Sequence, residues 1–522
     1  MALLDRSHSC SHLEAASLIH FKNSFSITQT DHAALYCDDF ASLKSYPKTN
    51  SWKEGTDCCS WDGVTCDHLN AHVIALDLSC SWLYGTFPSN TTLFLLPHLQ
   101  KLNLAYNDFN SSKIPSEFGR FTSLFYLNLS NTWFSEVPSQ VSHLSKLVSL
   151  DLSGFDELLT IDKYALEGLV HNLTQVRRLF LDEMDMSSVN AHVFMNLSSS
   201  LRSLSLSGNQ NLNLDLLKFS RSSNLEHLGL SWISFSTELI DSVGNLQALK
   251  YLDLSGNSFF QRFSVSITNL SSLEYLIISE ANMCGGLPDS MGNLESLKFL
   301  DLSSNELSGQ IPLSILNLTQ LEYLEIARNS LEGSIPDENI AFLDLSSNLI
   351  CGNLPIPAST IRVFLISNNS FNGEVSSLIS NASSLRILDL SHNNLSGTIL
   401  QCFGDLSNYL EFLNLNKNKF YGTIPPTFAK GCQLSNFQLK WKYVRRAFDT
   451  ILNCKGLEVL DLGNNKINDT FPHWGNPFPT CGMAMGCAVF QTGKAKRLVN
   501  LAEDQHEKRR RRKPKYSNRI NG

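Results

Sequence analysis

Three cysteines fall within nine residues of one another, at Cys58, Cys59 and Cys66. Cysteines at such short spacing either form disulfides or bind a metal ion. A zinc site needs a second set of Cys or His ligands at matching spacing, and no such set follows Cys66. The spacing therefore favours disulfides, which form in the secretory route, and predicts no metal site.

The sequence contains none of the short motifs on which catalysis commonly depends. We find no Gly-rich phosphate loop, no G-x-S-x-G, no H-E-x-x-H and no kinase signature. The 14 histidines are scattered singly, which is typical of surface and turn residues rather than of ligands. We therefore expect a protein that is not an enzyme and that needs no cofactor.

Aromatic residues recur at one position of five successive segments that start 19 or 24 residues apart. If these segments are parallel strands about 4.8 Å apart, the rings can stack on one another. Two interpretations stay open: a ladder that stiffens the sheet, or part of a platform for a ligand. The column comprises Tyr251, Tyr275, Phe299, Tyr323 and Phe342.

Carboxylates follow the last three of these rings by two residues, at Asp301, Glu325 and Asp344. Carboxylates at strand spacing repel one another. This column therefore either binds cations of neighbouring side chains or awaits a basic ligand. A structural role is favoured because Asp recurs at the same position elsewhere, at Asp77, Asp151, Asp253, Asp389 and Asp461.

The segments that position these side chains are copies of one repeat. Clear copies of LxxLxLxxNxL begin at Leu249, Leu297, Leu385 and Leu457, and weaker ones extend the series back to Val73. Seventeen starts between Val73 and Leu457 give a mean spacing of 24 residues. This is the signature of leucine-rich repeats, in which LxxLxL is a short strand with its leucines in the core.

The rest of the repeat is a turn and a return segment. An Asn follows most strands, and its amide can bond backbone groups of neighbouring coils. A second half of the form LxGxIP follows in several copies, as at Leu307–Pro312, where Gly permits a tight turn and Pro ends the pairing. The turn asparagines are Asn107, Asn257, Asn305, Asn329, Asn348, Asn369, Asn393, Asn418 and Asn465.

The LxGxIP form resembles the plant-type leucine-rich repeat of extracellular receptors, over residues 10 to about 474. The start also looks like the N-terminal cap of such proteins, with a helix over Glu14–Lys22, Ser51-Trp52 and the segment 57–66. The resemblance implies a right-handed α/β solenoid with a parallel sheet on its concave face and a helical, disulfide-bonded cap. It also implies that Cys10 pairs with Cys58 and Cys59 with Cys66, and we pair the remaining Cys37 and Cys80 by elimination.

Five further cysteines sit singly in repeats and are expected to be small buried apolar residues, namely Cys284, Cys351, Cys402, Cys432 and Cys454.

Glycosylation sequons are dense, and those reading NLS or NLT before the next strand are expected on the outer face. Eleven asparagines head an N-x-S/T: Asn90, Asn110, Asn128, Asn172, Asn196, Asn269, Asn317, Asn368, Asn381, Asn394 and Asn468.

The two ends are less regular than the repeats. Residues 1–9 lack the apolar core of a signal peptide. After Trp474 the repeats stop, and a nine-residue apolar piece, 482–490, leads into a basic tail with eleven Lys or Arg from Lys494 to Arg519. Nine residues are half of what a membrane span needs, so we expect this piece not to anchor stably. Expected boundaries are 1–72 for the cap, 73–474 for the repeats, 475–493 for a membrane-segment remnant and 494–522 for a cytoplasmic-type tail.

The cap and the C-terminal pattern together resemble plant receptor-like proteins of the tomato leaf-mould resistance class. This implies a plasma-membrane receptor that recognises an extracellular peptide, protein or glycan and signals through a co-receptor kinase, with no nucleic-acid partner. The repeats and closing cap on which such a kinase docks are missing between Trp474 and Gly482, so we expect an internally deleted copy. The alternatives are a secreted protein similar to polygalacturonase inhibitors, or a receptor fragment without function.

Overall fold

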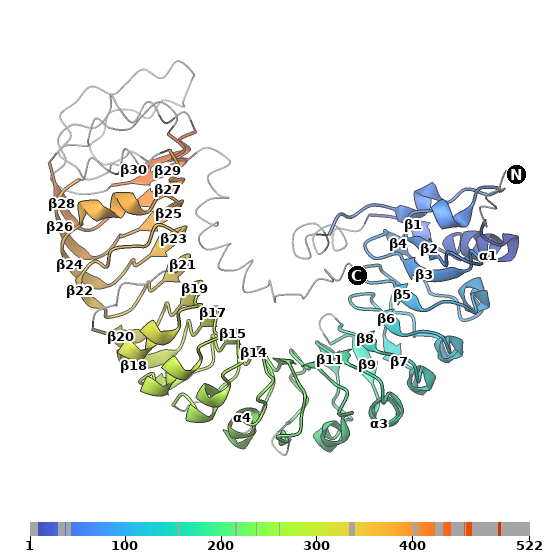
Figure 1. Cartoon of the computed structure of the whole chain (residues 1–522). Helices are drawn as coiled ribbons and strands as arrows, with labels where there is room; N and C mark the ends of the chain where they lie inside the picture. The colour runs from blue at the N-terminus through green and yellow to red at the C-terminus, as the bar shows by residue number, and fades with distance from the viewer. Residues whose placement is uncertain are drawn as a thin grey trace, which may run out of the picture. The chain divides into compact units, whose positions relative to one another are not determined.

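The computed structural model describes residues 9–29, 37, 43–154, 157–214, 217–235, 237–259, 262–333, 340–399, 403, 406, 408–422, 432–439, 454, 456–461 and 489–491. The chain divides into two compact units, Met1–Asn257 with Arg510–Gly522, and Ser258–Arg509. Each unit is a stack of leucine-rich-repeat coils, and Figure 1 shows strands along one side of each stack and helices along the other. The expectation of a leucine-rich-repeat solenoid with an N-terminal cap is confirmed.

In the first unit, every repeat start from Val73 to Leu249 is followed by a strand of one sheet. Neighbouring strands run parallel and in register, so Leu102 pairs with Leu127 and Leu127 with Leu150. The sheet opens with β2 (Val64–Cys66), which is antiparallel to β3. The parallel strands are β3 (Val73–Asp77), β5 (Lys101–Asn103), β6 (Tyr126–Asn128), β8 (Ser149–Asp151), β10 (Arg178–Phe180), β12 (Ser203–Ser205), β13 (His227–Gly229) and β14 (Tyr251–Asp253).

The second unit repeats the pattern from Tyr275 onward. Its strand leucines are buried, with Leu300 and Leu388 at 0% exposure, while the alternate positions face the strand side. β31 (Val489–Gln491) pairs antiparallel with the last repeat strand. The parallel strands are β15 (Tyr275–Ile277), β17 (Phe299–Asp301), β19 (Tyr323–Glu325), β21 (Phe342–Asp344), β23 (Val363–Leu365), β25 (Ile387–Asp389), β27 (Phe412–Asn414), β29 (Asn436–Gln438) and β30 (Val459–Asp461).

Shorter strands come from the second half of the repeats, where the LxGxI segments pair with one another. In the first unit these are β4 (Leu83–Tyr84), β7 (Glu136–Val137), β9 (Leu159–Ile161) and β11 (Met184–Asp185), and β1 (Ser26–Ile27) of the cap pairs antiparallel with β4. In the second unit they are β16 (Cys284–Gly285), β18 (Glu306–Gln310), β20 (Ser330–Glu332), β22 (Cys351–Asn353), β24 (Ser370–Glu374), β26 (Asn394–Thr398) and β28 (Lys419–Tyr421).

Among the described residues, short helices form the side opposite the strands in most coils, and three more lie in the cap. Most are single 3-10 turns that begin after a Pro or at a Ser or Asn cap, as at Pro312 and Ser376. The helices are α1 (His12–Lys22), η2 (Lys48–Ser51), η3 (Cys58–Ser60), η4 (Thr92–Leu95), η5 (Ser116–Arg120), η6 (Ser139–His143), α3 (Lys163–Asn172), η7 (Ala191–Asn196), α4 (Thr237–Val243), η8 (Val265–Asn269), η9 (Asp289–Asn293), η10 (Leu313–Asn317) and η11 (Ser377–Asn381).

Buried asparagines bond one coil to the next, as the repeat pattern predicts. Asn305 donates through Nδ2 to the carbonyls of Ile278 and Leu302, at 2.7 and 3.0 Å, and Oδ1 accepts from the amides of Ala281 and Met283, both at 3.0 Å. Asn209 makes the same kind of bonds, although the sequence pattern missed it. Asn465 lies outside the described residues. Equivalent bonds are made by Asn107, Asn257, Asn329, Asn348, Asn369, Asn393 and Asn418.

Candidate functional site

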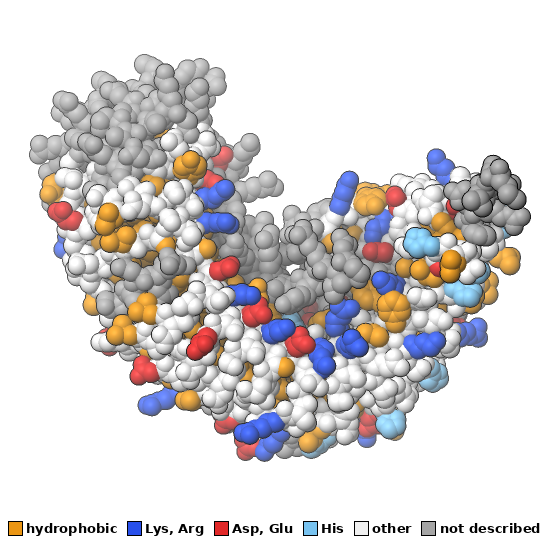
Figure 2. Space-filling model, viewed as in Figure 1, with side chains coloured by type: hydrophobic (Ala, Val, Ile, Leu, Met, Phe, Trp, Pro, Cys, Tyr) orange, Lys and Arg blue, Asp and Glu red, His pale blue; other side chains and the backbone are white. Residues whose placement is uncertain are grey.

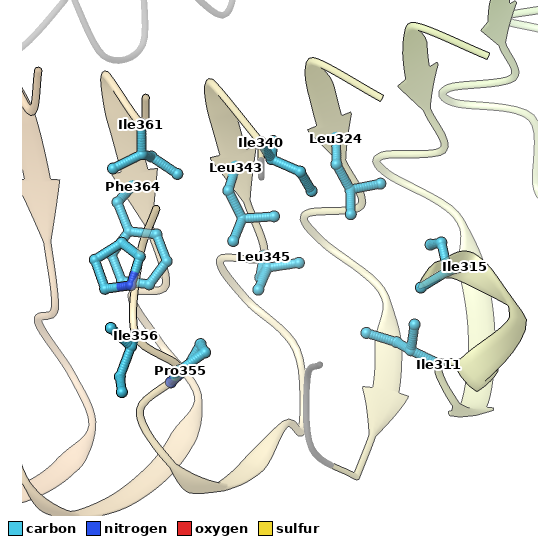
Figure 3. Close-up of a pocket in the computed structure, with 11 residues that line it drawn as sticks. Ile311, Ile315, Leu324, Ile340, Leu343, Leu345, Pro355, Ile356, Ile361 and Phe364 are labelled. Atoms are coloured by element: carbon cyan, nitrogen blue, oxygen red, sulfur yellow. The ribbon is translucent and has the colours of Figure 1, made fainter. Parts of the chain in front are cut away.

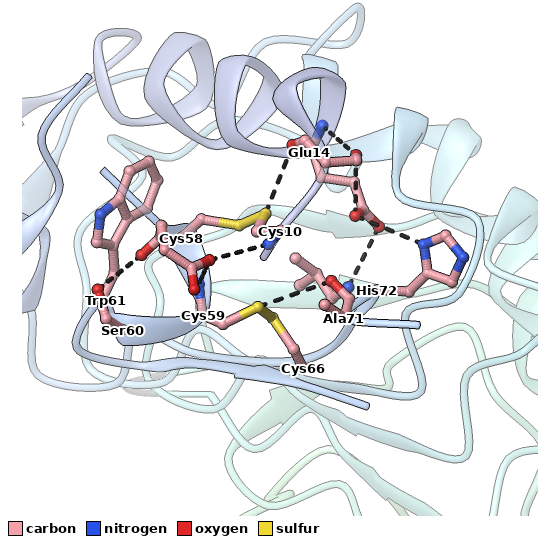
Figure 4. The surroundings of a disulfide bond; sticks show 12 residues. Cys10, Glu14, Cys58, Cys59, Ser60, Trp61, Cys66, Ala71 and His72 are labelled. Carbon is pink, nitrogen blue, oxygen red and sulfur yellow. Dashed lines mark hydrogen bonds and ion pairs between the residues drawn. A yellow bond between two sulfur atoms is a disulfide. The ribbon is translucent and has the colours of Figure 1, made fainter. Parts of the chain in front are cut away.

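The cap is held together by the three disulfides expected from the sequence. Cys10 is bonded to Cys58, Cys59 to Cys66 and Cys37 to Cys80. Figure 4 shows the first two bonds lying close together beneath the start of α1. Because all three sulfur atoms of Cys10, Cys58 and Cys59 are in disulfides, their closeness reflects cross-linking and offers no thiolate to a metal.

Glu14 joins the cap helix to the first strand. Its side chain is 7% exposed, and Oε1 accepts from the amide of Val73 at 3.2 Å, while Oε2 lies 3.7 Å from Nδ1 of His72. Ser11 caps the helix by accepting from the amide of Glu14. The helix therefore begins two residues earlier than expected, at His12 instead of Glu14, because Ser11 supplies the cap.

Four of the five aromatic residues singled out in the sequence form one continuous stack in the second unit. Ring centroids are 6.0 Å apart between Tyr275 and Phe299, 4.0 Å between Phe299 and Tyr323, and 4.1 Å between Tyr323 and Phe342. The last two pairs are within 9° of parallel. The stack follows from the register of β15, β17, β19 and β21, whose strands place these residues side by side.

Tyr251 belongs to the first unit, where it stacks on His227 at 4.1 Å between centroids. His227 was not predicted from the sequence as part of the stack, because the aromatic column comprises only Phe and Tyr residues. Tyr251 is buried, and this burial raises its pKa well above the usual range, an effect to which the nearby carboxylates of Asp253 and Asp182 add. The tyrosine therefore stays neutral over the physiological pH range.

The three carboxylates lie in register beside the stacked rings. Asp301 is paired with Glu325, and Glu325 with Asp344, on neighbouring strands. Glu325 and Asp344 are 4% and 1% exposed, and the hydroxyl of Tyr323 donates to Glu325. We call this group of side chains the acidic–aromatic patch, defined as Tyr275, Phe299, Tyr323, Phe342, Asp301, Glu325 and Asp344.

The aspartates of this column also stabilise the turn that follows each strand by accepting hydrogen bonds from it. Oδ1 of Asp301 accepts from the amide and hydroxyl of Ser303 at 2.9 and 2.7 Å, and Asp344 does the same with Ser346. Asn128, at the equivalent position, accepts from the amide of Ser130 at 2.9 Å. The turn therefore needs the side-chain oxygen and not the charge.

Asp389 lies at the same repeat position as Asp301 and Asp344, and its carboxyl makes the stability of the protein depend on pH. Desolvation raises the pKa of its carboxyl, while hydrogen bonds from Ser391 and Asn414 oppose the shift. A raised pKa means that the folded state favours the neutral carboxyl. The carboxyl therefore stabilises the folded state fully at pH values below its pKa in the unfolded chain. This stabilisation is lost as pH rises through the raised pKa of the folded state.

We therefore expect Asp389→Asn to stabilise the protein relative to the unsubstituted chain more at pH 7 than at pH 4. Asn is compatible with the turn, since Asn128 and Asn414 occupy the same position. Thermal unfolding midpoints at the two pH values give the measurement. If the difference in unfolding midpoint between the two chains were the same at both pH values, ionisation of Asp389 would cost the folded state no stability.

The sequons expected on the outer face lie at the ends of helices. Asn172, Asn196, Asn269 and Asn317 are the last residues of α3, η7, η8 and η10, and all four are exposed. Asn381 ends η11 in the same way, and Asn90, Asn110, Asn368 and Asn394 are also exposed. Asn128 differs, because it lies on β6 at the strand side and is partly buried. Asn468 lies outside the described residues.

The expectation of single buried cysteines is wrong for four of the five. Cys432 and Cys454 form a disulfide with Cα atoms 4.6 Å apart, because they occupy nearly equivalent positions of adjacent coils, 22 residues apart. Because this spacing is close to one repeat, the disulfide between Cys432 and Cys454 could have been predicted from the sequence. Cys284 is partly exposed and Cys351 exposed, since both lie on the short strands of the second sheet. Cys402 lies outside the described residues.

An apolar pocket lies where the repeats are shortest. It opens between the coils around Ile311, Leu324, Leu343 and Phe364, with a volume of about 20 Å³, room for little more than one water. Figure 3 shows apolar side chains pointing into it from several strands. In the repeat that starts at Ile340, the segment Pro355–Pro357 stands where other coils have a helix. The pocket is a packing defect without polar groups to orient a ligand.

The described residues carry charges of both signs on the side in view in Figure 2. Figure 2 shows acidic and basic side chains interspersed over the visible side of the described residues. The expected membrane-segment remnant, 475–493, and the basic tail, 494–522, fall almost entirely outside the described residues. Within the described part of the chain, no helix combines the length and apolar character required to cross a bilayer.

Comparison with known families supports the repeat assignment. The model described as "Leucine-rich repeat region" matches residues 175–424, and "Leucine Rich Repeat" matches 98–121 and 456–477. The model described as "Leucine rich repeat N-terminal domain" matches residues 40–67, within the expected cap.

Related proteins of plants share the sequence over part of their length. Receptor-like protein Cf-9 of Solanum pimpinellifolium is 40% identical over 229 residues, which are 43% of this chain and 26% of that protein. Receptor-like protein 6 of Arabidopsis thaliana is 38% identical over 271 residues, 46% of this chain and 27% of that protein. The chain thus matches about a quarter of the length of these relatives.

Solved structures with the same fold include plant receptors with bound peptides. The plant peptide hormone receptor RGFR1 in complex with RGF2 has a TM-score of 0.56 and 25% identity, covering 78% of this chain and 72% of that chain. The complex PEPR1–AtPEP1 has a TM-score of 0.53 and 25% identity, covering 86% of this chain and 72% of that chain.

Proposed function

Since the chain is a plant-type leucine-rich-repeat protein whose curated relatives are receptor-like proteins, we propose that it recognises an extracellular ligand through its strand face. The recognition is non-catalytic, and a separate receptor kinase supplies phosphorylation at the plasma membrane. The structural relatives with bound peptides favour a peptide among the peptide, protein and glycan ligands.

The observation that carries this proposal is the acidic–aromatic patch. Its rings lie outside the leucine core, and Phe299, Tyr323 and Phe342 each remain partly exposed. The rings are not part of the leucine core that maintains the repeat, so they are suited to recognition. The closely stacked rings form a continuous surface across four adjacent strands.

We test this by binding and footprinting with the full chain, secreted behind an added signal peptide. The panel comprises synthetic peptides of cationic, neutral and acidic charge, chitin and pectin oligosaccharides, and a fungal polygalacturonase. We expect a ligand that protects β15, β17, β19 and β21 from hydrogen exchange and that loses at least tenfold in affinity when Phe299 and Tyr323 are both changed to Ser. Leu316→Ser, on the exposed side of η10, is the matched control and should bind normally.

Two outcomes would contradict the proposal. The first is a ligand whose footprint lies only on the helix side of the coils, and the second is a panel in which nothing binds. Inhibition of the polygalacturonase by protein recovered from the medium, with a footprint away from the patch, would favour the secreted inhibitor-like alternative.

A further inference from the structure

We propose that N-linked glycans at six sequons of the helix side cover the apolar side chains exposed beside them, so that this side of the coils is a carbohydrate-covered face. This inference goes beyond the proposed function, because it concerns the side opposite the strands and requires only passage through the secretory route. The six sequons are headed by Asn90, Asn172, Asn196, Asn269, Asn317 and Asn381.

Exposed apolar side chains and sequons occur on the same helices. Ten described helices belong to the repeats, and six of them carry a large apolar residue that is at least 43% exposed, namely η4, α3, η7, η8, η10 and η11. Each of these six helices has one of the six sequons at its last residue or, for η4, two residues before its start. The exposed residues are Leu95, Tyr164, Met195, Val265, Leu313, Leu316 and Leu378.

The other four described helices of the repeats have neither feature. On η5, η6, α4 and η9 no described residue is an exposed large apolar one, and no sequon falls there. The neighbouring helices η9 and η10 show the contrast at matched positions. η9 begins with the exposed Asp289 and ends at Asn293, which is followed by Leu and Glu. η10 begins with Leu313 and ends at Asn317, which heads a sequon. Both helices end in Asn, so the exposed leucine accompanies the sequon and not the asparagine.

The spacing along the helices lets a glycan reach these side chains. With a rise of about 2.0 Å per residue in a 3-10 helix, Leu313 lies about 8 Å along the axis from Asn317. Leu378 precedes Asn381 by three residues, and side chains at that spacing lie one above the other. The longest separation within a helix is on α3, where eight residues span about 12 Å. Sugar rings carry C–H groups on their faces, so a bulky glycan can lie against apolar side chains while its hydroxyls face water.

The attachment is the transfer that the secretory route carries out on a sequon. Nδ2 of the asparagine forms a bond to the anomeric carbon of an oligosaccharide that is carried on a lipid diphosphate. The bond from this carbon to the diphosphate breaks, and the lipid diphosphate leaves while Nδ2 releases one proton. All six asparagines are exposed in the folded coils, so the fold has room for the product.

A glycan accounts for these side chains better than a protein partner does. Exposed apolar side chains favour association of a protein with others unless something covers them. A glycan on each of the six helices would stand between their apolar residues and the surface of a partner. The helices without a glycan expose no large apolar residue among their described positions, so they offer a partner no apolar contact either.

The test uses the full chain, secreted behind an added signal peptide, with hydroxyl-radical footprinting read by peptide mass spectrometry. We expect a glycan on all six asparagines. In Asn317→Gln, labelling of Leu313 and Leu316 should rise at least about twofold, because the bulky glycan no longer excludes solvent from them. Leu378 keeps the glycan of its own helix and should be labelled as before.

Asn394→Gln is the matched control for the loss of one glycan. Asn394 heads an exposed sequon on β26, where its partner on β24 is the polar Asn372 and not an apolar residue. Its replacement should leave the labelling of Leu313, Leu316 and Leu378 unchanged.

The combined effect of the six glycans is measured by sedimentation of the purified protein. Replacing all six asparagines by Gln should make the secreted protein self-associate, because the apolar residues are then uncovered. Replacing the seven exposed apolar residues by Ser in the same chain should restore a single-chain species without any of the six glycans. If the six-site variant is not secreted, enzymatic removal of the glycans from the purified glycoprotein gives the same comparison.

Three results would overturn the inference. The first is Asn317 without a glycan in the secreted chain, and the second is unchanged labelling of Leu313 and Leu316 in Asn317→Gln. The third is self-association that the Ser replacements do not reverse, which would show that the glycans act in some way other than covering these side chains. None of these results bears on ligand binding at the strand face, so a failure here leaves the proposed function standing.

Discussion

Replacing Asn305 by Ala is expected to destabilise the second unit by on the order of 4 kcal/mol, because three backbone groups lose their side-chain partner at once. The carbonyl of Ile278 and the amides of Ala281 and Met283 belong to the preceding coil, so the loss falls on the bond between coils. Asn305 is 9% exposed, which leaves little room for water to replace the amide. Chemical denaturation, with hydrogen exchange of residues 278–305 to locate the change, gives the measurement.

The control for this prediction is Asn372→Ala. Asn372 is an exposed residue of β24, and the same side chain is removed there without leaving buried groups. Its effect should stay within about 0.5 kcal/mol. If Asn305→Ala were as mild as this control, the Asn-mediated bonds between coils would not be a main source of stability.

Replacing Cys58 by Ser is expected to destabilise the cap by about 4 kcal/mol, since the Cys10–Cys58 bond joins residues 48 apart in the sequence. The Cys59–Cys66 bond joins residues only 7 apart, so Cys66→Ser should cost less, about 2.5 kcal/mol by the same chain-entropy argument. Both changes should reduce the yield of secreted protein, with Cys58→Ser the more severe. Yield and the denaturant midpoint of the cap are the readouts.

Cys351→Ser is the matched control for the cap cysteines, because Cys351 is exposed and free. It should leave yield and midpoint unchanged. Mass spectrometry that found Cys58, Cys59 and Cys66 as free thiols in secreted protein would contradict the prediction, as would equal effects of Cys58→Ser and Cys351→Ser.

The repeat, the strands and the cap could be read from the sequence because each depends on local pattern. Leucines at alternate positions, an Asn after the strand and a mean spacing of 24 residues predict one strand per repeat, and all seventeen expected starts are followed by one. The alternation determines which side chains enter the core whatever the neighbouring coil is. The outer-face position of the NLS and NLT asparagines followed from the same repeat geometry.

Other features were decided only by contacts between coils. The stacking of Phe299 on Tyr323 depends on exact register, and the Cys432–Cys454 disulfide depends on the distance between two coils. The double use of Asp301, as a turn acceptor and as a charge beside the rings, also needs the positions of neighbouring strands. A single repeat specifies its own strand and turn, but it cannot bury its own face. The side chains that meet on the strand face are therefore set by the stacking of neighbouring coils.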